Sequence, residues 1–394
     1  MSHKLINRSP DLKRLRDEGF DVEIRSGHML VKDVPYVNTR REVQRGILVS
    51  TLTLAGDVTT KPDNHVAYFI GEYPCRWDGT EIEQIKNPNP ATALAEGLFV
   101  NYTFSAKPHE PYPDYYAKMT TYVAILEGQA RVIKPAATAK TFPVIAPGED
   151  DADTPFNYID TASSRAEIGL ITRKLAIEKI AIVGLGGTGA YVLDLAAKTP
   201  VKEIHLFDGD VFLQHNAFRS PGAPSIDELG SKPGKAAYLC AIYSKMRRGI
   251  VVHAEYVGPE NVELLRDMRF VFLCLDRGTA KKLIVERLEE FGISFIDVGM
   301  GLYATDNMLG GVLRVTTSTP KQPDYFRSHV SFSDNEENNE YARNIQIADL
   351  NALNAALAVI KWKKRLGFYL DLDCEHHCTY TIDGNALTNE DLRP

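Results

Sequence analysis

The sequence predicts an α/β protein in which a Rossmann-like, doubly wound and mostly parallel sheet follows a smaller N-terminal α+β domain. After residue 165, short apolar runs alternate with helical stretches, as in proteins built from buried parallel strands and intervening helices. Before residue 150, apolar and polar residues alternate over short stretches, as in half-buried strands. Because 394 residues exceed one ordinary core, we expect two domains, residues 1–150 and residues 160–394.

The composition is that of a globular protein and argues against several classes. Hydrophobic residues make up 44% of the chain and charged residues 25%, and the net charge of −7 disfavours nucleic-acid binding. No apolar run approaches the ~20 residues of a membrane-spanning helix, and the polar N-terminus shows no secretory signal. The 5 cysteines show no disulfide pattern, which fits a reducing cytosol. We therefore expect a cytoplasmic protein with no nucleic-acid or membrane partner.

The first domain is expected to contain several strands and two helices. Aromatic and β-branched residues alternate with polar ones in VEIRSGHMLVKDV, GILVSTLTLAG, HVAYFIGEYPC, FVNYTFSA and TTYVAILEGQARVI. We predict helices at residues 10–18 and 90–97. Residues 147–157 are acidic and carry proline and glycine, as linkers do. This domain shows no catalytic set of residues, and its role stays open between substrate recognition, partner recruitment and dimer formation.

In the second domain, predicted strands and helices alternate along the chain. Strands are expected at residues 179–187, 203–210, 250–257, 270–276, 294–301 and 310–319. Helices are expected at residues 189–199, 234–246, 260–268, 279–292 and 342–366. Helices between short buried strands are typical of a doubly wound parallel sheet, in which ligands bind beyond the carboxyl ends of the strands.

A glycine-rich turn separates the first of these strands from the helix that follows it. Its glycines are Gly184, Gly186, Gly187 and Gly189. Glycines let the backbone turn tightly and approach a phosphate, and the helix that follows offers free N–H groups and the positive end of its dipole. We interpret the turn as a nucleotide phosphate site. By itself it does not separate NAD, FAD and ATP, and a turn without a ligand is the alternative.

Polar residues follow the second strand. Asp208 ends that strand, 24 residues after Gly184, where a carboxylate can accept hydrogen bonds from ribose hydroxyls. The residues that follow and can converge on a triphosphate are Asp210, Asn216, Arg219, Lys232 and Lys235. Arginine and lysine neutralise the charge that develops on the α-phosphate and on the leaving pyrophosphate. A dehydrogenase would need Asp208 but not these residues.

An acidic residue also ends the apolar strand predicted at residues 270–276. Asp276 is the last residue of that strand, so its carboxylate is expected to point into the ligand crevice. Beside a triphosphate, such a carboxylate is suited to hold Mg²⁺. The alternative is that Asp276 caps the helix that starts near Thr279.

These motifs carry a resemblance over about residues 165–365. The stretch resembles the ThiF/MoeB family, which shares its adenylation domain with ubiquitin-activating enzymes. The family pattern has a glycine motif, Asp-x-Asp at the second strand, Asn-x-x-Arg, a lysine and a strand-end aspartate. The matching residues here are Gly184 to Gly189, Asp208 and Asp210, Asn216 and Arg219, Lys235, and Asp276.

The resemblance implies ATP and Mg²⁺ as ligands and gives each matching residue a role. Asp208 would bind the ribose of ATP, and Asp276 would hold Mg²⁺. Asn216, Arg219 and Lys235 would bind the phosphates and assist adenylation.

The match has departures from the family pattern. Lys235 stands one residue later than usual, so Lys232 competes for its role. The family often carries an arginine in the helix after the magnesium aspartate, and here Arg277 and Lys281 are the nearest cations, so the residue that makes this contact stays open.

The resemblance also implies partners. Family members form homodimers or pseudo-dimers in which an arginine crosses to the neighbouring active site; Arg165 is our candidate, with Arg173 as the alternative. The segment HNAFRSPGAPS resembles a bacterial subgroup that occurs beside ubiquitin-like and conjugating-enzyme-like proteins. A ubiquitin-like or other small protein with a free C-terminus is therefore the expected substrate, with a conjugating-enzyme-like protein as a second partner.

Two cysteines and two histidines lie close together in residues 374–378. Four ligands within five residues would strain a tetrahedral zinc site, so we expect an exposed tail without zinc. Onward transfer of the acyl group would need an exposed, activated cysteine. Cys374, Cys378 and Cys75 stay open as thioester carriers.

The predicted reaction is attack of a carboxylate on the α-phosphate of ATP, with release of pyrophosphate. A carboxylate is already ionised at neutral pH, so catalysis would consist of positioning and charge stabilisation. Two rival interpretations are an NAD-dependent oxidoreductase and an inert scaffold that binds a partner. Binding of ATP with Mg²⁺, compared with binding of NAD(H), separates the adenylating enzyme from the oxidoreductase.

Overall fold

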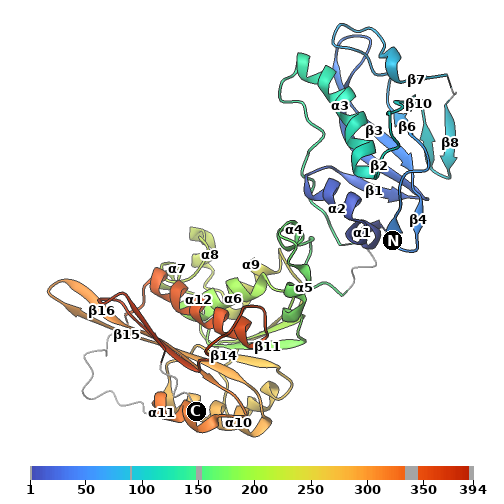
Figure 1. The fold of residues 1–394 in the computed structure, drawn as a ribbon. Helices are drawn as coiled ribbons and strands as arrows, with labels where there is room; N and C mark the ends of the chain where they lie inside the picture. The colour runs from blue at the N-terminus through green and yellow to red at the C-terminus, as the bar shows by residue number, and fades with distance from the viewer. Residues whose placement is uncertain (1, 89–90, 148–152, 333–344, 390–394) are drawn as a thin grey trace. The chain divides into compact units, whose positions relative to one another are not determined.

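A computed structural model describes residues 2–88, 91–147, 153–332 and 345–389 (Figure 1). The chain folds into two compact units. The first comprises Met1–Asp153 and Tyr158–Arg165, and the second comprises Thr154–Asn157 and Ala166–Pro394. Each unit has its own hydrophobic core. Among the described residues, no helix combines the length and the apolar character that crossing a bilayer requires.

The first unit is built on an antiparallel sheet of six strands. The strand order is β1 (Val22–Arg25), β2 (His28–Val37), β3 (Val43–Thr51), β6 (Val66–Ile70), β10 (Tyr102–Ser105) and β7 (Lys86–Asn87). Its short additional elements are α1 (Ser2–Arg8), α2 (Pro10–Asp17), β4 (Leu54–Ala55), β5 (Val58–Thr59), η1 (Glu83–Ile85) and α4 (Thr161–Arg165). The helix predicted at residues 10–18 is confirmed by α2.

One predicted strand of the first unit is wrong. Residues 120–133 belong to the helix α3 (Tyr115–Ile133), which Asp114 caps by accepting a hydrogen bond from the N–H of Ala117. The β-branched and aromatic residues of this stretch suggested a strand. Their buried members instead recur at helical spacing, as Tyr122, Val123 and Leu126 show, and they pack in the core beneath the sheet.

The helix predicted at residues 90–97 is also wrong where the structure describes it. Residues 91–97 contribute β8 (Thr92–Ala95), which pairs with β9 (Leu98–Val100). Gly97 lies between the two strands with φ of +70°, a conformation that turns the chain back and that glycine adopts without strain. The turn at Gly97 thus joins two short strands where a helix was predicted.

The second unit contains an eight-stranded sheet. The order is β13 (Ile250–His253), β12 (Glu203–Phe207), β11 (Lys179–Val183), β14 (Phe270–Leu273), β15 (Phe295–Thr305), β16 (Met308–Ser318), β17 (His377–Thr381) and β18 (Ala386–Asn389). The strands from β13 to β15 are parallel, and those from β15 to β18 are antiparallel. This confirms the predicted α/β class with a doubly wound, mostly parallel sheet.

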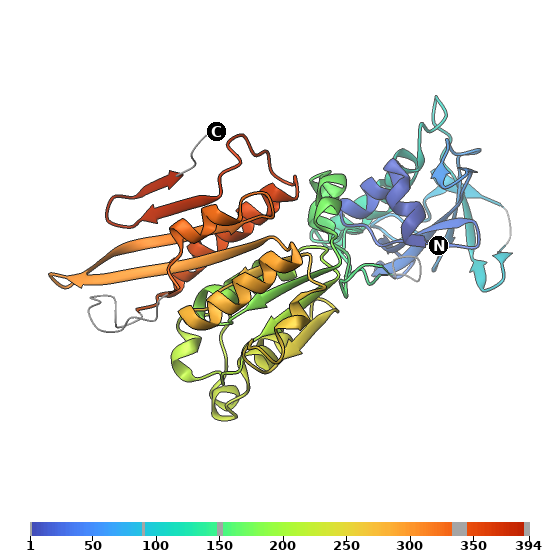
Figure 2. The same cartoon turned by 90° about the horizontal axis from the view of Figure 1, so that it is seen from below.

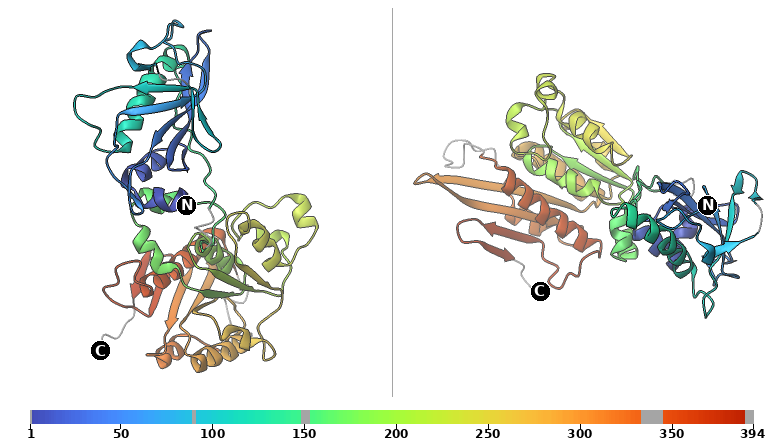
Figure 3. Two further views of the ribbon diagram at one scale, coloured as in Figure 1. Left: turned by 90° about the vertical axis from the view of Figure 1, so that its right-hand side faces the viewer. Right: turned by 90° about the horizontal axis from the view of Figure 1, so that it is seen from above.

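Helices cover both faces of this sheet (Figures 1 and 2). Ile180 and Ile182 of β11 pack in one core with α6 (Gly187–Ala197) and α12 (Ala348–Arg365), whereas Ala181 and Val183 pack in another core with α10 (Gly278–Phe291). Alternate residues of a strand point to opposite faces, so an uninterrupted apolar strand feeds two cores. Figure 3 shows the long β15–β16 hairpin extending beyond these helices.

The connections place a crevice between β11 and β14. The chain runs from β11 to β12 and β13 on one side, and then returns to β14 and β15 on the other. Ligands of doubly wound sheets bind where the direction of winding changes. The other helical segments of this unit are α5 (Gly169–Thr172), η3 (Arg173–Leu175), α7 (Gln214–Ala217), α8 (Ile226–Gly230), α9 (Lys235–Tyr243), η4 (Val262–Leu265) and α11 (Pro323–His329).

The C-terminal segment corrects one expectation. Residues 374–378 do not form an exposed tail throughout, because β17 joins the sheet beside β16 and buries His377 and Cys378, although Cys374 is exposed. The predicted helix at 342–366 is present from Ala348, and its residues 342–344 lie outside the described ranges.

Candidate active site

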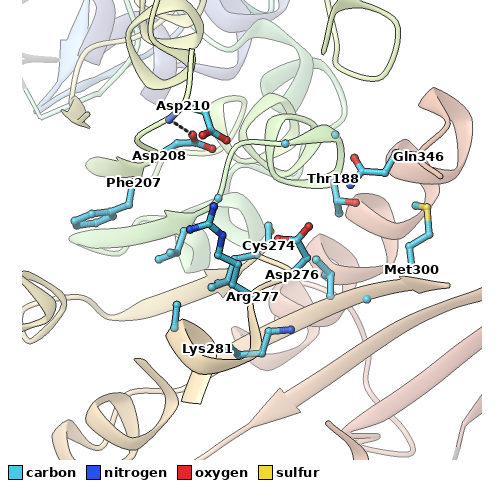
Figure 4. A pocket seen from close by; sticks show the side chains of 18 of the residues that line it. Thr188, Phe207, Asp208, Asp210, Cys274, Asp276, Arg277, Lys281, Met300 and Gln346 are labelled. Carbon is cyan, nitrogen blue, oxygen red and sulfur yellow. Dashed lines mark hydrogen bonds between the residues drawn. The ribbon is translucent and has the colours of Figure 1, made fainter. Parts of the chain in front are cut away.

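A cavity of about 580 Å³ opens at the carboxyl ends of β11, β12 and β14 (Figure 4). The glycine turn after β11 forms one wall. Acidic and basic residues after β12 and β14 form two more, and residues of β15 and α12 close the remaining side. Gly184, Asp208, Arg219, Lys235 and Asp276, which are far apart in the sequence, therefore meet in one crevice.

The glycines of the turn serve different purposes. Gly184 has φ of +87°, and a Cβ there would lie 2.6 Å from the carbonyl oxygen of Cys274. A Cβ on Gly189 would lie 1.9 Å from the carbonyl oxygen of Gly184, so this glycine allows α6 to pack against the turn. A Cβ on Gly186 would meet nothing within 4 Å, although Gly186 lines the cavity. Space is therefore open in front of Gly186, at the start of α6, where a phosphate could approach the backbone.

Asp208 is buried at the end of β12 and orders the backbone around it. Its Oδ2 accepts a hydrogen bond from the N–H of Leu185 at 2.6 Å, and its Oδ1 accepts one from the N–H of Asp210 at 2.9 Å. Asp208 therefore ties the glycine turn to the loop after β12. Each carboxylate oxygen has two acceptor sites, so Asp208 can still accept hydrogen bonds from a ligand hydroxyl.

Asp210 and Lys235 form an ion pair at the cavity. Lys235 Nζ lies 2.7 Å from Asp210 Oδ2, and the hydroxyl of Tyr256 donates a hydrogen bond to Oδ1. Burial alone would raise the pKa of Asp210, but the hydrogen bonds from Lys235 and Tyr256 outweigh burial and lower it. Hydrogen bonding to Asp210 raises the pKa of Tyr256, so its hydroxyl stays protonated as a donor.

Arg219 contributes a second cation to the cavity. Its Nε is buried without a hydrogen-bond acceptor among the described residues. A buried guanidinium N–H costs free energy unless it finds an acceptor, so this position suits an anionic ligand. Arg219 follows a turn in which the Oδ1 of Asn216 accepts a hydrogen bond from the N–H of Leu213 at 2.8 Å.

Asp276 lies after β14, beside two further cations. Arg277 and Lys281 also line the cavity, and Figure 4 shows the Asp276 carboxylate between the glycine-turn residue Thr188 and Arg277. Lys281 Nζ lies 2.8 Å from Oδ1 of the fully buried Asp297, whose Oδ2 lies 2.6 Å from Arg314. The cavity is thus lined by four cationic side chains, Arg219, Lys235, Arg277 and Lys281, and by the carboxylates Asp208, Asp210 and Asp276.

Some residues predicted from the sequence do not line this cavity as the structure describes it. Gly189 packs inside the turn, Asn216 is buried in its own loop, and Lys232 is exposed with φ of +47°. Arg165 ends α4 in the first unit, and Arg173 is exposed at the start of η3 in the second.

The sequence interpretation missed several residues that do line the cavity. Tyr256 follows the strand β13, Thr188 lies inside the glycine motif, and Asn351 comes from α12. Thr188 stands within a motif that already indicated a site. Nothing in the sequence around Asn351 indicated a contact across 163 positions, which only the fold creates.

Of the five cysteines, Cys75 and Cys378 are buried, Cys240 and Cys274 are partly buried, and Cys374 is exposed. Burial raises the pKa of Cys274, which lines the cavity, and the pKa of Cys75, which is buried in the first unit. Both therefore favour the neutral thiol over the reactive thiolate. Cys378 is buried in β17, whereas Cys374 is exposed. The described residues contain no group of three or more His, Cys, Asp or Glu that could hold a metal by itself.

Two family models match this chain. The model described as the ThiF family matches residues 163–383, and a model described as a domain of unknown function (DUF6791) matches residues 10–161. None of the curated proteins matches the chain in sequence.

Solved structures with a similar arrangement include two proteins, MccB and PaaA. E. coli MccB with MccA-N7isoASN is 16% identical and has a TM-score of 0.44, with 59% of this chain and 68% of that chain covered. E. coli MccB with ATP is 17% identical with a TM-score of 0.42, covering 58% and 67% of the two chains. PaaA is 18% identical with a TM-score of 0.42, covering 57% and 76%.

Proposed function

This chain belongs to the ThiF family of ATP-dependent adenylyltransferases, and from this premise we propose that it activates the C-terminal carboxylate of a ubiquitin-like or other small protein. The activation joins a carboxylate oxygen to the α-phosphate of ATP and breaks the bond between that phosphate and the leaving pyrophosphate. The product is an acyl-adenylate.

The observation that carries the proposal is the convergence of an open glycine turn and two cations in one cavity. Gly186 leaves space at the start of α6, Arg219 presents a buried Nε, and Lys235 is held at 2.7 Å from Asp210. Backbone N–H groups at a helix start and nearby cations are the features that bind a triphosphate. A dehydrogenase would not need Arg219 and Lys235 at this site.

The chain's own residues would act by positioning and by charge stabilisation. Asp208 would hold the ribose, and the glycine turn would hold the phosphates. Arg219 and Lys235 would stabilise the negative charge that increases on the transferring and leaving phosphates. The attacking carboxylate is ionised at neutral pH, so the site needs no general base.

Asp276 would hold Mg²⁺ in this proposal. Mg²⁺ usually binds one or two carboxylates together with substrate phosphates, and Asp276 lines the cavity beside the glycine turn. When bound, the ion would neutralise phosphate charge and orient the triphosphate.

The partner and the assembly are also proposals. Onward transfer to a thiol or to a conjugating-enzyme-like protein would follow adenylation, and Cys374 is the exposed thiol of this chain. A homodimer would bring Arg165 or Arg173 of one subunit to the other subunit's site. The cytoplasmic location expected from the cysteines stays a prediction.

Incubation with ATP and Mg²⁺ tests the proposed function. The small proteins encoded beside this chain serve as acceptors, and mass spectrometry detects an added AMP group or a thioester. We expect one of them to become adenylated by the native chain and not by the Lys235→Ala variant. If none is modified and no peptide or small protein supports ATP–pyrophosphate exchange, the proposed substrate class is wrong.

Mixed dimers test the arginine that crosses between subunits. In the proposal, each site uses Lys235 of one subunit and an arginine of the other, so two inactive variants complement each other. An equal mixture of Lys235→Ala and Arg165→Ala chains, or Arg173→Ala chains, should regain about a quarter of native activity, because half of the dimers contain one complete site. If the mixture with Arg165→Ala and the mixture with Arg173→Ala both stayed inactive, neither arginine would act in the other subunit's site.

A further inference from the structure

The start of α12 makes a contact that connects two walls of the cavity. Asn351 lies in the first turns of this helix and is 1% exposed. Its Oδ1 accepts a hydrogen bond from the hydroxyl of Thr188 at 2.8 Å, and its Nδ2 donates one to the carbonyl oxygen of Arg219 at 3.3 Å. One buried amide therefore joins the glycine turn to the residue that carries a cavity cation.

The same amide packs tightly against the glycine turn. A Cβ on Gly187 would lie 2.0 Å from Asn351 Nδ2, so Gly187 has no room for a side chain while Asn351 is in place. The absence of a side chain at Gly187 is thus explained by a contact with α12, whereas Gly186 faces open space. This contact therefore lies in the packed interior and does not involve a flexible side chain on the surface.

The contact holds the backbone of Arg219 at its carbonyl oxygen. No described group accepts a hydrogen bond from its Nε, so the protein does not hold the guanidinium at that atom. The location of the charge is then set largely by where the Arg219 backbone is fixed. The Arg219 N–H donates a hydrogen bond to the carbonyl oxygen of Asn216 at 3.1 Å, and Asn351 bonds the same backbone at the carbonyl oxygen of Arg219.

The second asparagine of α12 supports the same view of this helix. Asn354, one turn further on, is fully buried and donates a hydrogen bond from Nδ2 to the carbonyl oxygen of Gly299 at 3.0 Å. Gly299 lies in β15 and also lines the cavity. Two amides of one helix therefore bond to the backbone of two residues that line the same cavity, Arg219 and Gly299.

We propose that Asn351 is a positioning residue of the ATP site, which fixes Arg219 and the glycine turn relative to each other. This inference rests on the proposed function, because it assigns Arg219 to the phosphates of ATP. Asn351 acts through Thr188 and Arg219 and not by chemistry of its own. Misplacing a charged group by about 1 Å can cost ~100-fold in rate, so such a residue matters without contacting a reacting atom.

A mutant cycle in ATP affinity tests this coupling. In the full chain with Mg²⁺, Asn351→Ala should weaken ATP binding about tenfold, as expected when a positioned cation is displaced. In the Arg219→Ala background, the same change should weaken binding much less, since the group that Asn351 positions is already absent. Equal losses in both backgrounds would overturn the proposal, because they would mean that Asn351 does not act through Arg219.

Two further variants separate positioning from loss of folding. Thr188→Val removes the hydroxyl that bonds Asn351 and should weaken ATP binding, whereas Thr188→Ser keeps the hydroxyl and should restore it. Val359→Ala removes buried volume from the same helix, in the core and away from the cavity, and serves as the matched control for stability. If Val359→Ala weakened ATP binding as much as Asn351→Ala, general destabilisation would replace the proposal.

Amide hydrogen exchange without nucleotide tests the contact apart from any activity. Asn351→Ala should speed exchange in residues 184–190 and in the segment around Arg219. Val359→Ala should not speed exchange preferentially in these two segments. Thr188→Val should affect the glycine turn more than the Arg219 segment. Unchanged exchange in both segments would overturn the positioning role, whereas failure of ATP binding by the native chain would count against the proposed function instead.

Discussion

Lys235 and Asp210 form an ion pair in the wall of the cavity, with Nζ of the lysine 2.7 Å from Oδ2 of the aspartate. The lysine is buried and the aspartate is half exposed, and the ion pair holds the Lys235 ammonium group at the cavity wall. Tyr256 completes the arrangement by donating to the other oxygen of Asp210. The Asp210 carboxylate alone would repel a phosphate. In our proposal, its contribution to the site is to fix the position of Lys235.

The Asp210→Asn variant should separate positioning from phosphate affinity. The amide no longer holds Lys235 by charge, so kcat for ATP–pyrophosphate exchange should fall about tenfold. The KM for ATP should not rise, because a repulsive carboxylate is removed at the same time. Exchange is measured with the acceptor found by mass spectrometry, and a raised KM with unchanged kcat would contradict this role.

Two glycines of the turn should respond differently to alanine. Gly186→Ala places a methyl group in open space, so stability should change by no more than about 1 kcal/mol while ATP binding is lost. Gly189→Ala drives a methyl group against the carbonyl oxygen of Gly184 and should destabilise the unit by about 1–3 kcal/mol or more. Thermal unfolding and ATP titration of both variants check this. Retained ATP affinity in a stable Gly186→Ala variant would exclude the turn as the phosphate site.

Glu375 should make the stability of the second unit depend on pH in the acidic range. Burial alone would raise the pKa of Glu375, but the charge of Lys361 and the hydrogen bond from Lys364 outweigh burial and lower it below the ordinary 4.5. A lowered native pKa contributes stability that is fully present above about pH 4.5 and is lost as pH falls through the native value.

The Glu375→Gln variant measures this contribution. It should lose about 1–3 kcal/mol of stability at pH 7, and the difference from the native chain should shrink near pH 3. Glu263→Gln is the control, since Glu263 forms an exposed pair with Arg266 that is worth about 1 kcal/mol or less. If Glu375→Gln lowered the free energy of unfolding equally at pH 7 and near pH 3, the interactions of the Glu375 carboxylate with Lys361 and Lys364 would not be the cause of the loss.

Much of the second unit could be predicted because its signals are local. The apolar run of β11, the glycine turn and the start of α6 are contiguous, and strand-end residues such as Asp208 and Asp276 reach one crevice in any doubly wound sheet. The family model extends over this region, at residues 163–383. Local pattern and topology therefore indicated the same cavity.

The features that the sequence did not reveal depend on distant contacts. Residues 374–378 resemble a polar tail, but His377 and Cys378 pair with β16 and so belong to the sheet, and the hydroxyl of Thr316 lies 2.9 Å from Nδ1 of His377. The helix α3 was predicted as a strand, because its β-branched and aromatic residues suit a strand equally well. Asn351 shows no motif of its own, since its significance comes from the two segments that it bonds.

Calorimetric titration with ATP and Mg²⁺ tests the central claim, that one cavity binds the triphosphate. The native chain and Lys232→Ala should bind ATP alike, because Lys232 is exposed and does not line the described cavity. Lys235→Ala and Asp276→Ala should bind at least about tenfold more weakly, with unchanged thermal unfolding. Full ATP affinity in both of these variants, or binding of NAD in place of ATP by the native chain, would contradict the account.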